Sequence, residues 1–129
     1  MTALLQPLGR LMLAFIFIVA GIGKLADIAG TSAYMAAMGV SSTLLWPTIL
    51  LELLGGIAIA IGYKTGIAAF ALAIFSIAAA VLFHSDLGDK IQMVLFLKNI
   101  AIAGGLLMLA SAGTTAYSLD RKKQQSRFF

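Results

Sequence analysis

The sequence predicts an all-α integral membrane protein: a bundle of four transmembrane helices in one domain, residues 1–129. Of its 129 residues, 61% are hydrophobic and 11% are charged, and the mean hydropathy is +1.03. A soluble domain carries about 25% charged residues, so lipid has to be the outer solvent here. Four apolar runs are each close to the roughly 20 residues that cross a bilayer core. Backbone groups that face lipid must be paired within their own segment, so all four runs are predicted to be helices.

The first helix is predicted over about residues 8–26. Pro7 precedes it, a position where the missing N–H of proline leaves no helical donor unpaired. A positive residue, Arg10, before an apolar run is also the outline of a cleaved signal peptide. Lys24, however, interrupts the zone where cleavage would fall, and the run is long. We therefore interpret this segment as a membrane span.

The other three helices are predicted over about residues 44–61, 66–83 and 91–112. Residues 62–66 form a tight turn, so the second and third helices should be antiparallel neighbours. The loop at 27–43 is longer. Thr31 can cap a short helix there that Gly39 ends, and we expect this helix to lie on the membrane surface as a lid.

Positive residues predict the orientation of the bundle. With four spans, both termini share one side with Arg10, Lys64 and the tail at 118–129, and only Lys24 and Lys90 carry positive charge on the other side. Both termini are therefore predicted to be cytoplasmic. The basic tail is interpreted as a topology signal and as an anchor to anionic membrane lipids, and no nucleic-acid partner is expected.

Composition also limits the chemistry. The sequence has no cysteine and one histidine, His84, which excludes disulfides, cysteine-ligated clusters and a histidine-rich metal site. We expect no metal and no intrinsic cofactor. The sequence identifies no catalytic residue.

Polar residues gather in the outer half of the predicted bundle. At about 1.5 Å per residue, Glu52 and Lys98 lie at similar depths, and an ion pair between them would resolve the cost of burying either charge. Arg10 is expected to extend toward the inner interface, and Lys24 either does the same on the outer side or pairs with Asp27. The candidate ligand-binding residues are Lys24, Glu52, His84, Gln92, Lys98 and Asn99.

Two interpretations of this cluster stay open. In one, Glu52 and Lys98 form a structural pair that fixes the arrangement of the helices. In the other, the cluster lines a pocket that opens outward beneath the lid and holds a ligand.

Several segments, in order, resemble the DoxX family of small bacterial inner-membrane proteins. The matching segments are Gly21-Ile22-Gly23-Lys24-Leu25, Glu52-Leu53-Leu54-Gly55-Gly56, His84, Phe96-Leu97-Lys98-Asn99-Ile100-Ala101 with Gly104-Gly105-Leu106-Leu107, and Ser118-Leu119-Asp120. Family members often carry a Gly-Pro-Gly-like turn before the last of these, where this chain has residues 112–117 instead.

The resemblance implies a four-helix protein of the bacterial inner membrane, linked to membrane redox work through relatives such as a subunit of thiosulfate:quinone oxidoreductase. The first hypothesis is therefore a membrane subunit, with or without catalytic activity, that binds quinone and works with a redox partner protein. The alternative is a non-enzymatic scaffold or assembly partner. A solute or proton pathway is disfavoured because the polar residues do not continue into the inner half. Glycine-lined helix faces also suggest a homo-oligomer.

Overall fold

The computed structural model describes residues 1–128, and within them all regular structure is helical. The elements are α1 (Thr2–Ala26), α2 (Ile28–Ala37), the short 3₁₀ helix η1 (Ser42–Leu44), α3 (Leu45–Ile61), α4 (Thr65–Phe83), α5 (Lys90–Ala112) and α6 (Leu119–Ser126). Helices α1, α3 with η1, α4 and α5 are long and apolar enough to cross a membrane. The four predicted spans are confirmed.

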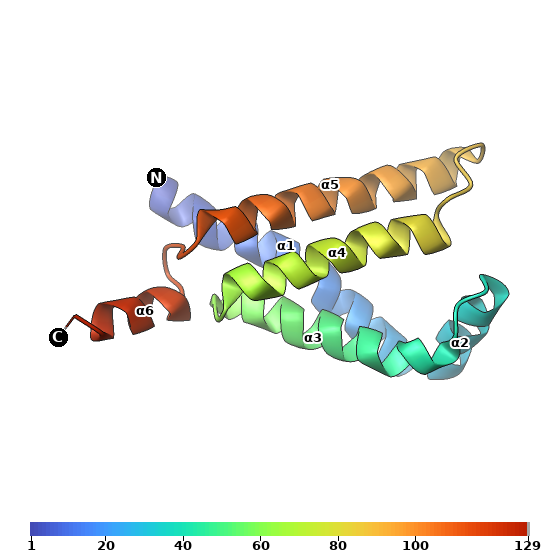
Figure 1. Cartoon of the computed structure of the whole chain (residues 1–129), viewed down its shortest axis with the longest axis horizontal. Helices are drawn as coiled ribbons and strands as arrows, with labels where there is room; N and C mark the ends of the chain where they lie inside the picture. The colour runs from blue at the N-terminus through green and yellow to red at the C-terminus, as the bar shows by residue number, and fades with distance from the viewer. Residues whose placement is uncertain (129) are drawn as a thin grey trace.

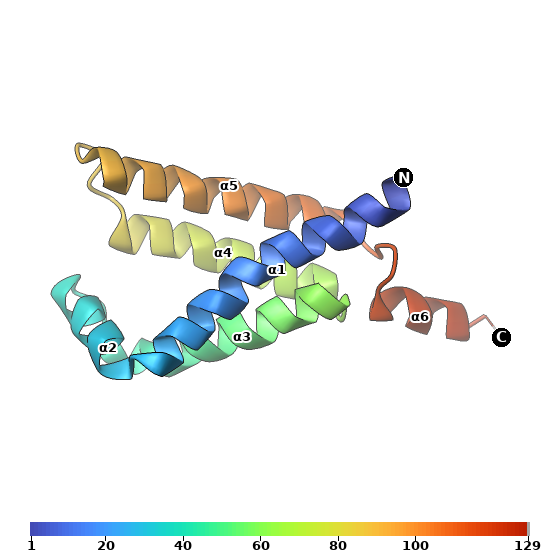
Figure 2. The same cartoon turned by 180° about the vertical axis from the view of Figure 1, so that it is seen from behind.

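The four long helices form two pairs. Helix α1 packs along α3, and α4 packs along α5. The pairs meet at the turn between α3 and α4 and diverge toward the far end of the bundle, where α2 lies (Figures 1 and 2). We call these the α6 end, which also carries both termini, and the α2 end. The bundle is therefore a wedge that is closed at the α6 end and opens toward α2.

Two glycines of α3 allow the close packing at the closed part of the wedge. A Cβ atom on Gly56 would lie 3.3 Å from the backbone oxygen of Ala14 in α1 and 2.9 Å from Cγ1 of Ile18. A Cβ atom on Gly55 would lie 3.0 Å from Cδ1 of Leu72 in α4. Small residues at these two positions therefore let α1 and α4 approach α3 closely.

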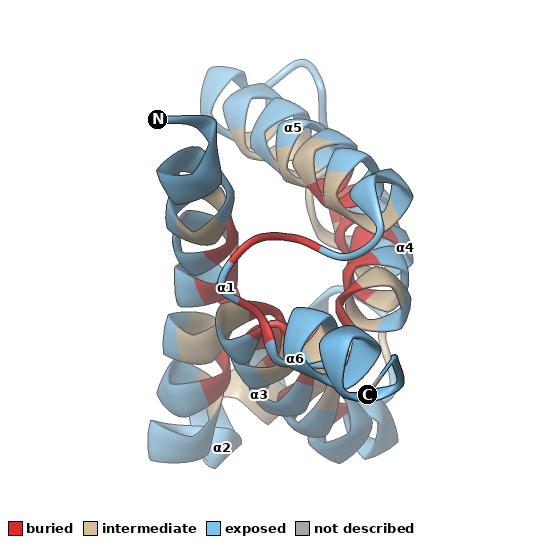
Figure 3. Cartoon of the chain, turned by 90° about the vertical axis from the view of Figure 1, so that its left-hand side faces the viewer, coloured by how far each residue is buried: buried red, intermediate tan, exposed pale blue. Residues whose placement is uncertain are grey.

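The core lies along the axis of the wedge, and the outward faces of the helices are exposed (Figure 3). Its main cluster of buried residues is Ala14, Phe17, Ile59, Ala69, Leu72, Ala73, Ala103 and Leu106. A smaller cluster beneath α2 consists of Met35, Leu45 and Ile49. Large apolar side chains on the outer faces are typical of helices that lipid surrounds.

Two predicted boundaries were wrong. Helix α1 begins at Thr2 and not near residue 8, so Pro7 lies inside it. This is tolerable because Pro7 is close to the helix start and removes a single backbone hydrogen bond. Helix α2 begins at Ile28, and its cap is Asp27, whose side chain accepts a 2.9 Å hydrogen bond from the Gly30 N–H. Thr31 instead lies within the helix.

Candidate functional site

A cavity of about 490 Å³ lies in the open part of the wedge, at the α2 end. Its walls come from α1, α3, α4 and α5, and α2 contributes Thr31, Tyr34 and Met35. The volume falls within the range of about 300–1,000 Å³ that is usual for small-molecule sites. Most lining residues are apolar, and the polar ones are Lys24, Thr31, Tyr34, Thr48, Glu52, Ser76, His84 and Asn99.

An ion pair between Lys24 of α1 and Glu52 of α3 stands in the wall of this cavity. The Lys24 Nζ atom is 2.8 Å from Oε2 of Glu52 and donates a 3.1 Å hydrogen bond to Oε1. Glu52 is only 3% exposed, whereas the Lys24 side chain is 25% exposed. Oε2 contacts the ammonium group but receives no hydrogen bond of good geometry from the described residues. The Glu52 carboxylate is thus buried, and its Oε2 atom can still accept a hydrogen bond.

Close packing of α1 on α3 brings these two residues together. A Cβ atom on Gly21 would lie 2.7 Å from Cγ of Leu53 and 3.5 Å from Cβ of Glu52. Because Gly21 has no side chain, the two backbones approach closely there, and Lys24 follows less than one helical turn later. Its side chain therefore reaches across to Glu52.

The predicted ion pair between Glu52 and Lys98 is wrong. Lys98 is exposed and does not line the cavity, although it lies at a depth similar to that of Glu52. The reason is the pairing of the helices: α3 packs against α1, and α5 packs against α4. Lys24 is also not paired with Asp27, whose carboxylate caps α2.

A second polar contact lies at the mouth of the cavity. His84 ends α4, and its Nδ1 atom is 2.8 Å from Oε1 of Gln92 in the first turns of α5. Since an amide oxygen only accepts, Nδ1 carries the proton of this hydrogen bond. His84 lines the cavity. Gln92 does not, and it contacts the His84 ring through this hydrogen bond. Asn99 lines the cavity from α5.

Helix α2 covers part of the opening, as expected of a lid. The ring of Tyr34 stacks on that of Phe83 at the end of α4, with the centroids 5.5 Å apart. Met35, 6% exposed, packs with Leu45 and Ile49 of α3. The lid is thus attached to both helix pairs across the widest part of the wedge.

Of the six candidate residues, the structure brings four to the cavity: Lys24, Glu52, His84 and Asn99. Gln92 takes part through His84, and Lys98 lies outside. Depth along each helix could be estimated from the sequence, but the direction in which a side chain points depends on which helices are neighbours.

Sequence reasoning missed a polar network at the α6 end. Arg10 is 3% exposed and does not extend to the interface as expected. Its guanidinium donates hydrogen bonds to Oγ1 of Thr115 at 2.6 Å and to the backbone oxygens of Ala116 at 2.9 Å and Tyr117 at 2.8 Å. The segment after α5, which crosses the end of the bundle in Figure 3, is thereby joined to α1.

Asp120 joins the same end to α4. Its carboxylate accepts hydrogen bonds from the N–H of Lys64 at 2.7 Å and from the N–H and hydroxyl of Thr65 at 2.9 and 2.8 Å. Burial raises the pKa of Asp120. The hydrogen bonds from Thr65 and Lys64 and the charge of Lys123 lower this pKa and together outweigh burial, so it lies below the usual value. Asp120 is therefore an ionised cap on the first residues of α4.

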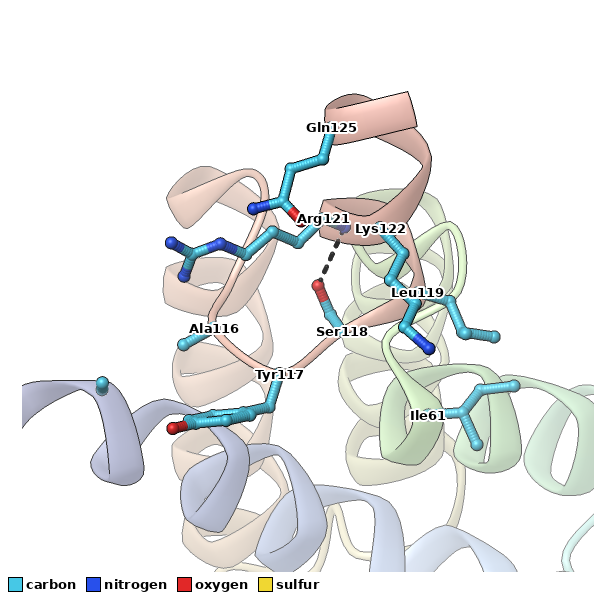
Figure 4. A pocket seen from close by; sticks show the side chains of 9 residues that line it. Ile61, Ala116, Tyr117, Ser118, Leu119, Arg121, Lys122 and Gln125 are labelled. Carbon is cyan, nitrogen blue, oxygen red and sulfur yellow. Dashed lines mark hydrogen bonds between the residues drawn. The ribbon is translucent and has the colours of Figure 1, made fainter. Parts of the chain in front are cut away.

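A second recess, of about 630 Å³, lies between α6 and the ends of α1 and α3 (Figure 4). Arg121, Lys122 and Gln125 of α6 border it, and Ser118 caps α6 by accepting a 3.2 Å hydrogen bond from the Arg121 N–H. These three α6 side chains are exposed. The cavity at the α2 end is the stronger candidate because a buried carboxylate, that of Glu52, stands in its wall.

The fold and the cavity define a small multi-pass membrane protein with a ligand-sized, largely apolar cavity and an ion pair with a buried glutamate in its wall. The profile of the DoxX family matches residues 5–85, more than half of the chain, and the chain belongs to this family.

Two relatives from Escherichia coli strain K12 are similar over most of their length. The inner membrane protein YqjF is 45% identical over 112 residues, which cover 87% of this chain and 86% of the relative. The inner membrane protein YphA is 34% identical over 122 residues, which cover 89% and 87%. No solved structure matches the chain. The chain is accordingly a DoxX-family protein of the inner membrane.

Proposed function

We propose that this protein is a membrane subunit or partner of a redox system and that it interacts with quinone in the cavity at the α2 end. One observation carries the proposal: a buried glutamate, paired with a partly exposed lysine, in the wall of a largely apolar cavity of about 490 Å³. Ionisable groups within a membrane are expensive and usually mark a ligand or proton path.

A quinone head group matches the chemistry of this cavity. It is an apolar ring with two carbonyl acceptors, and Lys24 and Asn99 offer N–H donors from different walls. His84 donates from Nδ1 to Gln92, which leaves Nε2 as an acceptor that can take a hydrogen bond from the hydroxyl of a quinol but not from a quinone carbonyl. Glu52 can exchange protons with the ring oxygens, because a carboxyl group can give up a proton and take one back.

Reduction of a quinone to a quinol takes up two electrons and two protons. Glu52 and Lys24 would handle the protons. The sequence offers no cysteine ligands and one histidine, so the electrons would have to come from a partner oxidoreductase. This is why we propose a subunit or partner and not a complete enzyme.

The excess of positive residues supports a cytoplasmic α6 end, which is part of this proposal. Lys64 lies in the turn between α3 and α4, and α6 and the residue after it carry Arg121, Lys122, Lys123 and Arg127. The cavity then opens on the outer half of the membrane, and α2 rests on the outer surface.

Binding of a short-chain quinone to the purified protein in lipid nanodiscs tests the proposal. Glu52→Gln and Lys24→Met each remove a charge from the cavity wall and should weaken binding at least tenfold, or about 1.4 kcal/mol. The matched control is Lys98→Met, the same change at a lysine outside the cavity. Equal affinities for wild type, Glu52→Gln and Lys24→Met would contradict the proposal.

A scaffold role is the second candidate, and the position of the pair at the α1–α3 contact favours it. If the pair acts only as a structural link, exchanging the charges (Lys24→Glu with Glu52→Lys) should restore most of the stability that either single change removes. The same exchange should abolish quinone binding if the site is functional, because the donor and the proton carrier would then have changed places.

A further inference from the structure

The cavity at the α2 end is open sideways, where α3 and α4 diverge. These helices touch at Gly55 and Leu72. Thr48 lies seven residues before Gly55, and Ala79 lies seven residues after Leu72, so each is on the same face of its helix as the contact. Both line the cavity. The faces of α3 and α4 that contact each other in the closed part of the wedge therefore continue toward the α2 end as two walls of the cavity. Figure 1 shows the two helices separating in that direction.

The rim of this opening is apolar. Leu44 and Pro47 border it from the α3 side, and Ala78 and Leu82 border it from α4. All four line the cavity and are also exposed, with Leu44 at 50% and Leu82 at 49%. Exposed lining residues border the places where the cavity approaches the surface, and Ile16 of α1 and Tyr34 of α2 are two others. The α3–α4 side is thus one of these places, and its rim is apolar. This stretch of surface belongs to membrane-spanning helices, so the opening faces the hydrocarbon of the bilayer.

The charged pair and Asn99 lie away from this rim, whereas the uncharged polar residues Thr48 and Ser76 belong to the walls from α3 and α4. Lys24 comes from α1 and Asn99 from α5, and Glu52 is held against α1 by its ion pair. The gap between α1 and α5 is less suited to an apolar chain: Lys98 lies seven residues before Gly105, on the face of α5 that meets Leu13 of α1. The ion pair is thus on the side of α1, and the rim between α3 and α4 is apolar.

We infer that the cavity takes an amphiphile whose head group lies at Lys24, Glu52 and Asn99 and whose long apolar tail passes between α3 and α4 into the bilayer. The inference rests on the proposed function for the head group, a quinone, and adds that the ligand carries a long tail and arrives through the lipid. The gap between Leu44 and Pro47 on one side and Ala78 and Leu82 on the other is then the route of the tail.

Closing this gap tests the route. Ala78→Trp places a large side chain at the rim, and Ile77→Trp is the matched control, because Ile77 is the next residue, is exposed and does not line the cavity. Binding of a long-tailed quinone and of its tail-less head group is measured for each variant in nanodiscs. We expect Ala78→Trp to weaken binding of the tailed quinone at least tenfold and that of the head group less than twofold, with Ile77→Trp leaving both unchanged.

Retained binding of the head group also demonstrates that Ala78→Trp is folded. Equal loss of both ligands, loss of neither, or a loss of tailed quinone with Ala20→Trp in the α1–α5 gap and not with Ala78→Trp would overturn the inference.

A second measurement separates this inference from the proposed function. A phospholipid with a photoactivatable group in its acyl chain should label Phe75 on the cavity wall of the wild type, and Ala78→Trp should suppress that label. If no quinone binds but this pattern holds, the quinone proposal fails and the tail route stands with a lipid as the ligand. If Phe75 is not labelled and no quinone binds, both fail.

Discussion

Arg10 and Thr115, 105 positions apart in the sequence, share a hydrogen bond of 2.6 Å between Nη1 and Oγ1. The same guanidinium holds the backbone oxygens of Ala116 and Tyr117. The segment that follows α5 is thus folded around a buried cation from α1. This contact closes the α6 end of the wedge and leaves the α2 end as the part of the bundle that is open.

Replacing Arg10 should destabilise the protein strongly. Arg10→Met removes a hydrogen-bonded cation and leaves buried oxygens without a donor, and each such bond to a charged group contributes about 1.5–3 kcal/mol. We expect a loss of about 3 kcal/mol in the free energy of unfolding, measured by denaturant titration in mild detergent. Arg127→Met, at an exposed position of the tail, should change stability by less than about 0.5 kcal/mol. Similar losses in the two variants would contradict this role for Arg10.

The cap at Asp120 makes stability depend on acid. The folded pKa of Asp120 lies below the unfolded value, about 3.9, so the ionised carboxylate stabilises the fold above about pH 4. That contribution is lost as the pH falls through the folded pKa. Asp120→Asn should therefore be less stable than wild type at pH 7, by about 1 kcal/mol. The difference should shrink below about pH 4 in thermal unfolding followed by circular dichroism.

The control for this pH dependence is Asp86→Asn, at an exposed loop position. Its stability should follow that of the wild type at every pH. If the stability difference between Asp120→Asn and the wild type stays constant from pH 7 to pH 3, the ionised carboxylate of Asp120 does not stabilise the fold.

The glycine contact between α1 and α3 should not tolerate even one methyl group. In Gly56→Ala the new Cβ atom meets the backbone oxygen of Ala14 at 3.3 Å, and a backbone atom cannot move aside as a side chain can. We expect a loss of about 1–3 kcal/mol from overpacking. Gly104→Ala in α5 has open space around its Cβ position and should be neutral or gain up to about 1 kcal/mol from helix propensity. Equal stabilities would mean that α1 and α3 are less closely packed.

A double-mutant cycle measures the coupling between Lys24 and Glu52. Lys24→Met leaves a buried carboxylate without its partner and should cost about 3–5 kcal/mol, whereas Lys24→Met with Glu52→Gln should cost clearly less. Unfolding titrations of the four proteins give the coupling energy directly. Additive effects of the two changes would indicate that the residues do not interact.

The sequence was sufficient for the outline of the fold. Apolar runs of about membrane length predict where helices lie, because only helices satisfy the backbone in lipid, and the depth of Glu52 follows from its distance to the end of its helix. That is why four of the six candidate residues were found in the cavity wall. The direction in which each side chain points could not be predicted in the same way, because it depends on which helices pack together.

The failures follow from that limit. Glu52 and Lys98 have opposite charges and similar depths, yet α1 and not α5 is the neighbour of α3, so Lys24 forms the pair. Arg10 was expected at the interface because two of its three partners are backbone oxygens, which no residue type reveals, and the third, Thr115, is 105 positions away. Asp120 belonged to a motif that resembled the family, but its role as a cap on α4 depends on a contact across 55 residues.

The central claim is that a quinone occupies the cavity at the α2 end, and photolabelling tests it most directly. The protein in native membrane vesicles is irradiated with an azidoquinone, digested and analysed by mass spectrometry. We expect adducts on cavity residues of α1, α3 and α4, such as Phe17, Leu51 and Phe75, and we expect excess unlabelled quinone to suppress them. Adducts confined to the lipid-facing surface or to the recess beside α6, unchanged by excess quinone, would contradict the account.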